Sequence, residues 1–268
     1  MSQTKQVALV SGSSRGIGAA TARGLGERGY HVIVNYLKSA AAAKDVVSAI
    51  TSAGGSAQAI QADVRDREQV RGLVEQIVRE HGQIDVLVCN ANTAPPTFEP
   101  FEEVMWGAFI AKFDGELAGA FHLTHSVLPI MRERRAGRIV YISSISGDVC
   151  AGQVAHSTAK SALNRFSRHV AAYAGQFGIS VNTVAPGSVK TDSSDTVNSP
   201  EIIQYLSERS VFARQMVPND VANVIASVVD VRFAAVTGQI ITVDAGMEVL
   251  AQQHMFVSKR KPLEPAAD

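Results

Sequence analysis

Two side chains that can carry protons, His156 and Lys160, lie four residues apart in the stretch VAHSTAKSALNRF. On a helix this spacing places both on one face, where the charge of one acts on the other. An imidazole titrates near neutral pH and can serve as a general acid or base. Upstream, Ser144 and Asp148 complete the order Ser, Asp, His of some hydrolases, but Ser144 does not stand in a Gly-x-Ser-x-Gly turn. The pattern therefore indicates acid–base chemistry at His156, with nucleophilic catalysis by Ser144 as an alternative.

A glycine-rich turn near the N-terminus indicates where a cofactor would bind. Gly12, Gly16 and Gly18 follow an apolar run and open a helical segment, SGSSRGIGAATARGLGERG. Glycines at such a turn let backbone N–H groups approach a pyrophosphate at the start of a helix. We therefore expect a dinucleotide here; the alternative is a plain tight turn.

The end of the second apolar run helps to choose between NAD and NADP. An NAD site usually places an acidic residue there to bind the ribose 2′-OH, but this chain has NYLKS, which begins at Asn35. Arg15 and Lys38 offer cations that suit a 2′-phosphate. The sequence therefore predicts NADP(H), unless both cations are only solvated surface charges.

The elements that must position these residues alternate along the chain. Seven short, β-branched runs, each bounded by Gly, Pro or Asn, cover residues 7–12, 31–36, 58–64, 85–91, 138–144, 179–187 and 239–246. Longer segments with helical spacing separate them, as in the stripe Val70, Val74, Ile77 and Val78. This alternation predicts an α/β Rossmann-type three-layer sandwich, with a seven-stranded parallel sheet and helices on both faces. We expect one dinucleotide-binding and catalytic domain over residues 1–250 and a C-terminal tail over residues 251–268.

Composition excludes several classes of protein. The chain has 268 residues, of which 46% are hydrophobic, and it balances 25 basic against 25 acidic residues. That balance gives no electrostatic reason to expect nucleic acid or a membrane as a partner. Its two cysteines, Cys89 and Cys150, are too few for a disulfide framework or a zinc site, so no metal is expected. The first apolar run is too short for a signal peptide, and we expect a cytoplasmic protein.

The order of these motifs resembles that of the short-chain dehydrogenase/reductase family, in particular its ketoacyl-reductase-like members. Beyond the glycine turn, the matching motifs are Asp63-Val64, Asn90-Ala91-Asn92, Ser144 (or Ser143), Pro186-Gly187-Ser188-Val189-Lys190-Thr191 and Asp244-Ala245-Gly246. In that family the Asp-Val pair contacts adenine and the Pro-Gly motif holds the nicotinamide amide. The expected cofactor-binding residues are Gly12, Ser14, Arg15, Gly16, Ile17, Gly18, Asn35, Lys38, Asp63, Val64, Asn90, Ala91, Lys160, Pro186, Gly187, Val189 and Thr191.

Two departures from the family pattern fall on its chemistry. The Tyr-x-x-x-Lys of the family becomes His156-Ser157-Thr158-Ala159-Lys160, and its helical Asn becomes Glu116. The resemblance therefore implies a catalytic set of Ser144, His156, Lys160 and Glu116. Lys160 alone would push His156 toward its neutral form, whereas Glu116 would oppose that push. We expect a Glu–Lys–His cluster that keeps an imidazolium available as proton donor.

The reaction stays open between several interpretations. An atypical NADPH-dependent reductase is favoured because the Pro186–Thr191 motif is intact, and the apolar part of residues 192–217 suggests a hydrophobic or polycyclic carbonyl substrate. A non-redox cyclase, isomerase or lyase on a reductase scaffold, and a silent subunit that pairs with an active homologue, are the alternatives. The resemblance also implies a homodimer or homotetramer, formed by helices around residues 107–135 and 153–175.

Overall fold

The computed structural model describes residues 5–92, 99–149, 153–191 and 199–252. All strands within these ranges form one parallel sheet in the order β3-β2-β1-β4-β5-β6-β7. The strands are β1 (Val7–Val10), β2 (His31–Tyr36), β3 (Ser56–Gln61), β4 (Val86–Cys89), β5 (Gly137–Ile142), β6 (Ile179–Pro186) and β7 (Ile240–Val243). The order reverses between β1 and β4, as in dinucleotide-binding folds. The predicted seven-stranded parallel sheet is confirmed.

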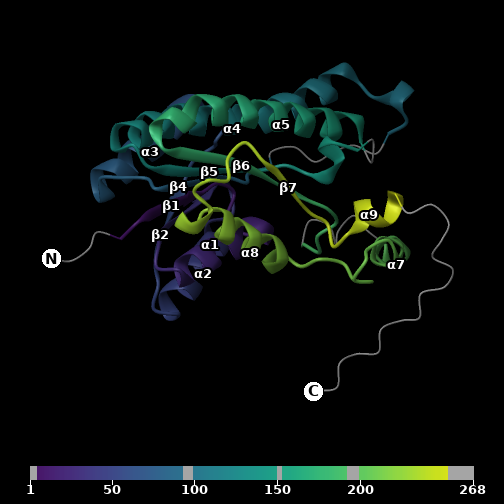
Figure 1. Cartoon of the computed structure of the whole chain (residues 1–268), viewed down its shortest axis with the longest axis horizontal. Helices are drawn as coiled ribbons and strands as arrows, with labels where there is room; N and C mark the ends of the chain where they lie inside the picture. The colour runs from purple at the N-terminus through teal and green to yellow at the C-terminus, as the bar shows by residue number, and fades with distance from the viewer. Residues whose placement is uncertain (1–4, 93–98, 150–152, 192–198, 253–268) are drawn as a thin grey trace.

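Helices cover both faces of this sheet (Figure 1). They are α1 (Gly16–Glu27), α2 (Ala40–Ser52), α3 (Arg67–His81), α4 (Trp106–Arg134), α5 (Val154–Ala174), α7 (Pro200–Glu208), α8 (Pro218–Val228) and α9 (Met247–Gln252). Short 3₁₀ turns occupy Phe101–Glu103, Ile145–Gly147, Gly175–Phe177 and Val231–Phe233. One apolar cluster joins the sheet to α3, α4 and α5, and a second joins it to α1, α2 and α8. The three-layer prediction is therefore confirmed as well.

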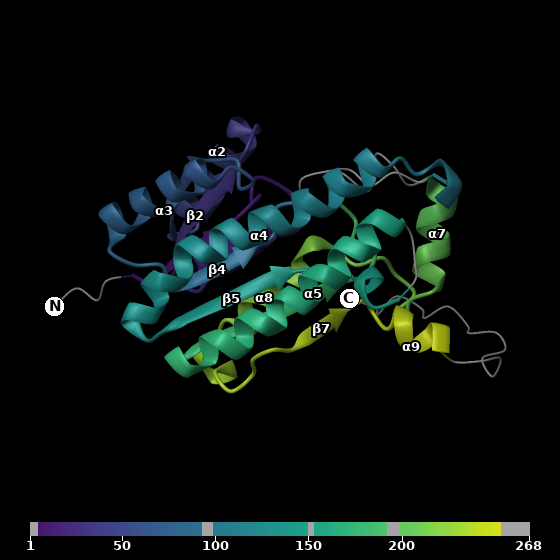
Figure 2. The same ribbon diagram turned by 90° about the horizontal axis from the view of Figure 1, so that it is seen from above.

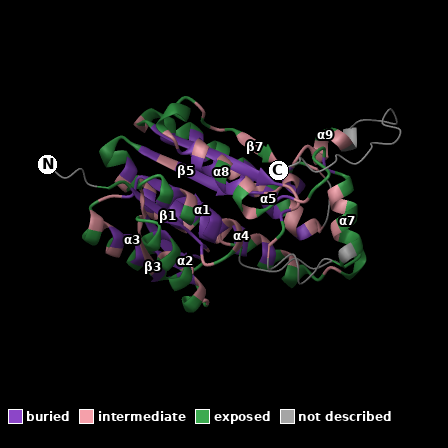
Figure 3. Cartoon of the chain, turned by 90° about the horizontal axis from the view of Figure 1, so that it is seen from below, coloured by how far each residue is buried: buried purple, intermediate pink, exposed green. Residues whose placement is uncertain are grey.

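The strands are apolar at consecutive positions because both faces of the sheet are covered. In β1, Val7 and Leu9 belong to the cluster under α3–α5, whereas Ala8 and Val10 belong to the opposite cluster. All four are at most 1% exposed. Figure 3 shows the buried sheet between helices whose outer faces are exposed. This arrangement explains why the sequence shows continuous apolar runs in place of an alternation.

Helix α3 shows how local sequence sets the bounds of an element. The Asp66 side chain caps its start by accepting hydrogen bonds from the backbone N–H groups of Glu68 and Gln69. Gly82 ends it at a φ of 75°, in the left-handed region that favours glycine. Between these caps, Val70 and Ile77 are fully buried, as the helical stripe predicts.

The carboxyl ends of the strands meet at one edge, and α7 and α9 lie beyond that edge (Figures 1 and 2). The expected domain boundary at residue 250 falls inside α9, and residues 253–268 lie outside the described part of the chain. None of the helices described is both long and apolar enough to cross a membrane.

One buried polar pair joins the sheet to α4. Tyr141 on β5 is fully buried, and its hydroxyl lies 2.6 Å from the Thr124 hydroxyl of α4. The Tyr141 ring also packs edge-on against Phe166 of α5. Burial raises the pKa of Tyr141, so the phenol stays protonated at this contact. The pair therefore ties β5 to the helix that carries Glu116.

We predict that Tyr141→Phe lowers the free energy of unfolding by about 1–3 kcal/mol, because the Thr124 hydroxyl loses its buried partner. Chemical denaturation measures this change. Tyr205→Phe, at a 53% exposed position on α7, is the matched control and should change stability by less than about 0.5 kcal/mol. Equal effects of the two substitutions would contradict the proposed contribution of the pair.

Candidate active site

A single cavity of about 780 Å³ lies at the carboxyl edge of the sheet and gathers most of the predicted site residues. It is lined by all seventeen residues expected to bind the cofactor, and by Ser144 and His156. Asn92, Ser39 and Ile142 also line it. Glu116 is absent from this wall and acts on the cavity through Lys160. In the described residues, no group of three acidic, His or Cys side chains could hold a metal ion.

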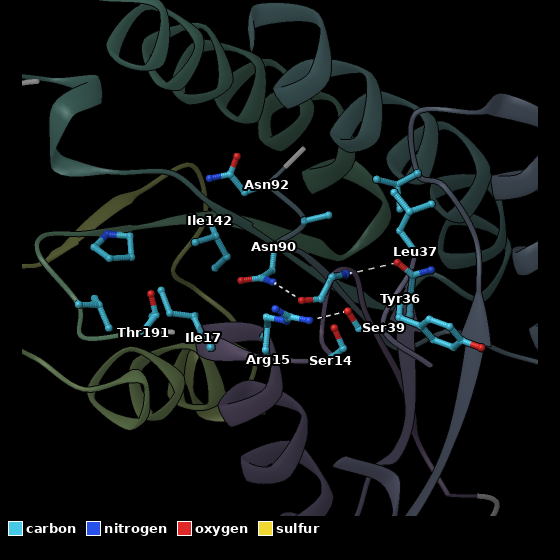
Figure 4. Close-up of a pocket in the computed structure, with 18 of the residues that line it drawn as sticks. Ser14, Arg15, Ile17, Tyr36, Leu37, Ser39, Asn90, Asn92, Ile142 and Thr191 are labelled. Atoms are coloured by element: carbon cyan, nitrogen blue, oxygen red, sulfur yellow. Dashed lines mark hydrogen bonds between the residues drawn. The ribbon is translucent and has the colours of Figure 1, made fainter. Parts of the chain in front are cut away.

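The glycine turn forms a cradle that side chains would fill. Gly12 and Gly16 have φ values of 60° and 57°. A Cβ on Gly12 would lie 2.7 Å from the Cα atom of Ala91, and one on Gly18 would lie 2.6 Å from the Gly12 carbonyl oxygen. Asn90 holds the turn by donating hydrogen bonds of 3.0 Å to the Ser11 carbonyl and 3.1 Å to the Gly12 carbonyl. Figure 4 shows the second of these bonds. These positions therefore require glycine, as a pyrophosphate-binding turn does.

The end of β2 carries cations and no acid. Arg15 donates a 2.5 Å hydrogen bond to the Ser39 hydroxyl (Figure 4), and Lys38 lines the same part of the cavity. Asn35 is 1% exposed and accepts from the Gly12 N–H while donating to two carbonyls of the β3 segment. Asn35 therefore braces the glycine turn, and its amide does not point freely into the cavity. The local charge fits a 2′-phosphate better than a bare ribose hydroxyl.

Two further segments complete the cofactor wall. Asp63 pairs with Arg65 at 2.6 Å, and this contact lowers the pKa of the Asp63 carboxyl. After β6, the Gly187 N–H donates to the Val243 carbonyl, and a Cβ on Gly187 would lie 2.8 Å from that of Asp244. The late Asp-Ala-Gly motif thus packs against the Pro-Gly motif. The residues present fit a nicotinamide dinucleotide along the whole cavity.

A buried ion triad lies beneath the catalytic end. Glu116 accepts hydrogen bonds of 2.6 Å from Lys112 and from Lys160, one at each carboxylate oxygen. Lys112 also donates to Asn92 Oδ1 at 2.7 Å, and Lys160 donates to the Ile142 carbonyl at 3.0 Å. The exposed fractions of the three charged side chains are 2–7%. The expected contact between Glu116 and Lys160 is therefore present, with a second lysine that the sequence analysis did not anticipate.

The triad decides the charge state of Glu116. Burial opposes ionisation of its carboxyl, but Lys160 and Lys112 outweigh burial and hold the pKa of Glu116 at about 2. Two ammonium groups around one carboxylate leave one net positive charge beneath the cavity. That charge acts on the first turn of α5, where His156 lies.

The structure corrects the expectation of an imidazolium at His156. Burial, followed by the charges of Lys160 and Lys112, lowers the pKa of His156 to about 4, and Glu116 opposes them too weakly. The ring is therefore neutral at physiological pH. The expectation was wrong because it left out the burial of the ring, which is the largest cause, and because it counted only one of the two lysines that contact Glu116.

One ring nitrogen of His156 is buried without a hydrogen-bond partner in the described structure, namely Nδ1. A buried N–H without an acceptor is more costly than a bare lone pair, and nearby cations favour the lone pair. We therefore assign the ring proton to Nε2, which leaves an N–H donor on the opposite side of the imidazole.

Ser144 lines the cavity without forming a hydrolase triad. Its oxygen accepts hydrogen bonds from the Ser146 N–H at 3.2 Å and from the Ser146 hydroxyl at 2.9 Å. The neighbouring Ser143 is 5% exposed and donates to the Lys160 carbonyl. Asp148 is exposed and accepts from Asn164 at 3.4 Å. The arrangement does not join Asp148 to His156, which argues against the nucleophilic interpretation.

Residues 192–198, which begin the segment expected to contact substrate, lie outside the described residues. In the described remainder of residues 192–217, Ile202, Tyr205 and Phe212 are 44–63% exposed. At the start of α4, Trp106 is 71% exposed and stacks on Phe109. The structure thus presents large apolar side chains near the end of the sheet where a substrate would enter.

Lys112 and Asn92 are the site residues that the sequence analysis missed. Lys112 stands four residues before Glu116, a spacing at which oppositely charged side chains meet on one helix face. It also follows the same face as Gly115 and Gly119, which are buried. This spacing is visible in the sequence, but a pair of opposite charges on a helix ordinarily indicates a face exposed to solvent and not a buried one.

Comparison with known proteins agrees with this geometry. Residues 12–248 match a family model described as enoyl-(acyl carrier protein) reductase. A 3-oxoacyl-[acyl-carrier-protein] reductase of Synechocystis sp. is 39% identical, over 91% of this chain and 97% of its own length. The corresponding reductase of Staphylococcus aureus is 35% identical, over 92% and 99%. An uncharacterised oxidoreductase of Methylorubrum extorquens is 38% identical, over 90% and 97%.

Solved structures give the same result. A 7α-hydroxysteroid dehydrogenase complexed with NADH and 7-oxo glycochenodeoxycholic acid superposes with a TM-score of 0.85 and 29% identity, covering 90% of this chain and 93% of that one. The crystal structure of gox2181 superposes with the same TM-score and identity, covering 91% and 96%. Because the family model and these relatives span nearly the whole described chain, this protein belongs to the short-chain dehydrogenase/reductase family of oxidoreductases.

Proposed function

We propose that this protein is an NADP(H)-dependent carbonyl reductase in which His156 stands where the family has its tyrosine. The observation that carries the proposal is the shared cavity: the glycine cradle, the Pro186–Thr191 segment, Lys160 and His156 line one continuous wall. Bound NADPH supplies the hydride for such a reduction. The chain's own residues must then hold the carbonyl, stabilise the developing oxyanion and deliver a proton.

NADP(H) is preferred over NAD(H) because of the charges at the end of β2. Arg15 and Lys38 stand beside Ser39, and no acidic side chain from β2 lines that part of the cavity. An acid there would accept bonds from a ribose diol but would repel a 2′-phosphate. Two cations and one hydroxyl are a suitable set for the phosphate oxygens.

His156 acts as a neutral donor in this proposal. Its Nε2–H can donate to the substrate carbonyl oxygen, as neutral imidazoles do in other enzymes that polarise carbonyls. The net positive charge of the triad stabilises the oxyanion that forms beside the ring. An imidazole nitrogen ends roughly 2 Å nearer its own Cα than a tyrosine oxygen does. The substrate therefore binds deeper toward α5, or one water joins it to the ring.

A hydrophobic carbonyl compound is the proposed substrate class. The exposed Ile202, Tyr205 and Phe212 would cover an apolar body, while Ser144 and His156 offer the polar groups that orient its oxygen. One named relative is a 3-oxoacyl-[acyl-carrier-protein] reductase, and the steroid dehydrogenase structure holds 7-oxo glycochenodeoxycholic acid, so both names include an oxo group on a largely hydrocarbon skeleton.

A non-redox acid–base enzyme remains the second candidate, because the neutral ring of His156 is also a base. His156 lines the cavity, so its ring could exchange a proton with a substrate that accepts no hydride. In that case substrate would be converted with no change in absorbance at about 340 nm, where reduced nicotinamide absorbs.

We also propose that the protein is cytoplasmic and forms a homodimer or homotetramer through α4 and α5. Phe121 and Tyr173, on these helices, are 50% and 48% exposed, and Phe121 contacts Phe166 across the pair. Burial of these rings against a second copy would remove apolar surface from water. Sedimentation velocity of Phe121→Glu, which should be monomeric, tests the assembly.

The first prediction for this site concerns His156 itself. His156→Ala should lower kcat for NADPH consumption by about 10²–10⁴-fold, because the proton donor is lost. His156→Tyr should retain or raise reduction, since a phenol restores the family's reach. His169→Ala, exposed on the same helix, is the control and should leave kcat unchanged. Unaltered turnover in His156→Ala would remove this residue from the mechanism.

The second prediction concerns protonation. In protein with ¹³C-labelled histidine, the His156 resonance should titrate near pH 4 and show no midpoint between pH 5.5 and 8. The unfolded ring binds its proton near pH 6.5, so His156 should weaken stability progressively as pH falls from about 6.5 to about 4. His156→Gln should remove that part of the decline. A titration midpoint above pH 5.5 would contradict the neutral ring and would support an imidazolium at His156 as the proton donor.

The third prediction concerns the cofactor. Arg15→Ala combined with Lys38→Ala should raise the Kd for NADPH by about tenfold or more, and should change that for NADH by less than about threefold. Fluorescence titration of the reduced nicotinamide measures both constants. Arg23→Ala, exposed on α1, is the matched control. Equal increases in Kd for NADPH and for NADH would show that Arg15 and Lys38 do not recognise the 2′-phosphate.

A further inference from the structure

Lys112 on α4 is buried, which is unusual for a lysine. A lysine on a helix ordinarily reaches water, but this one is 3% exposed and its ammonium lies 2.6 Å from Glu116. Burying an ammonium carries a large desolvation cost unless a partner compensates it. Glu116 and Asn92 supply that compensation, at 2.6 and 2.7 Å. Such a costly arrangement beside the reaction cavity calls for a chemical reason.

The reason lies in a count of charges. The family pattern that this chain resembles has Asn at this position, so that one lysine would place one positive charge beneath the reacting atoms. Glu116 next to Lys160 alone would reduce that charge to zero. Lys112 returns it to one positive unit, because both ammonium groups share one carboxylate. Burial lowers the pKa of Lys112, but the ionised Glu116 beside it keeps the ammonium charged.

We propose that Lys112 is a positioning residue of the active site, which balances Glu116 so that Lys160 and His156 experience one net positive charge where the substrate oxyanion forms. Glu116 and Asn92 hold it there from α4 and from the end of β4. The proposal rests on the proposed carbonyl reduction for its effect on rate, but the electrostatic effect on His156 exists without turnover.

The charged groups that act on His156 come from two helices. Lys160 belongs to α5, and Lys112 and Glu116 belong to α4. Lys112→Met removes one cation and leaves a neutral Glu116–Lys160 pair. Lys112→Met with Glu116→Gln leaves Lys160 alone, so that the net charge returns to one positive unit. The single and double variants therefore separate the loss of charge from the loss of the lysine.

The experiment compares wild type, Lys112→Met, Lys112→Met/Glu116→Gln and Lys112→Arg, with Lys44→Met as an exposed control on α2. Lys112→Met should lower kcat for NADPH-dependent carbonyl reduction by about tenfold or more, because oxyanion stabilisation is lost. The double variant and Lys112→Arg should recover most of that loss. An undiminished kcat in Lys112→Met, or no recovery in a folded double variant, would overturn the proposal.

A second readout does not depend on catalysis. The NMR titration midpoint of His156 should rise in Lys112→Met, where a repelling cation is gone, and return toward the wild-type value in the double variant. If wild type reduces no carbonyl, the proposed function fails, and these midpoints alone decide the role of Lys112. If the His156 titration midpoint is the same in all variants, and the Kd for NADPH is also unchanged, the proposed role of Lys112 is refuted.

Discussion

A carboxylate held between two ammonium groups governs the catalytic end of this protein. Glu116 lies beneath the cavity and is almost inaccessible to water, and its two oxygens contact Lys112 and Lys160 at 2.6 Å. An isolated ion at that depth would be strongly unfavourable, and each member is tolerated because the others are present. The triad fixes Lys160 against the Ile142 carbonyl and sets the charge that His156 meets. The reaction proposed here follows from that charge.

The sequence was sufficient for the fold because each strand satisfies the same requirement. A parallel sheet covered on both faces needs apolar residues at consecutive positions, and the central strands β1 and β4 show them along their whole length. Boundaries were less well predicted. The run at residues 58–64 begins earlier, at Ser56, because Ser56 pairs with His31 in the sheet register although it is not apolar. Pairing across strands decides where β3 begins, and a single segment does not contain that information.

The geometry of the glycine turn could be predicted from the sequence, whereas the charge state of His156 could not. Glycines at a strand–helix turn have few other uses, so Gly12 and Gly18 could be assigned from spacing, and their contacts agree. The protonation state of His156 depends on burial and on three charges from two helices. Lys112 was not anticipated, because a lysine four residues from a glutamate on a helix ordinarily indicates a solvated face. Burial of the imidazole, together with the charges of Lys160 and Lys112, keeps His156 neutral.

The two departures from the family pattern have different physical weight. Glu116 changes a charge, and Lys112 compensates that change within one helical turn, so the field beneath the substrate keeps its sign. His156 in place of tyrosine shortens the reach of the proton donor and changes its acidity. Among the described residues, none compensates for the shorter reach. A neutral imidazole is a weaker acid than a phenol beside a lysine, so it cannot drive proton transfer early in the reaction. It can donate a hydrogen bond throughout and release its proton once the oxyanion has formed. In the proposed reaction, oxyanion stabilisation by the net positive charge of the triad would therefore matter more than the acidity of the proton donor.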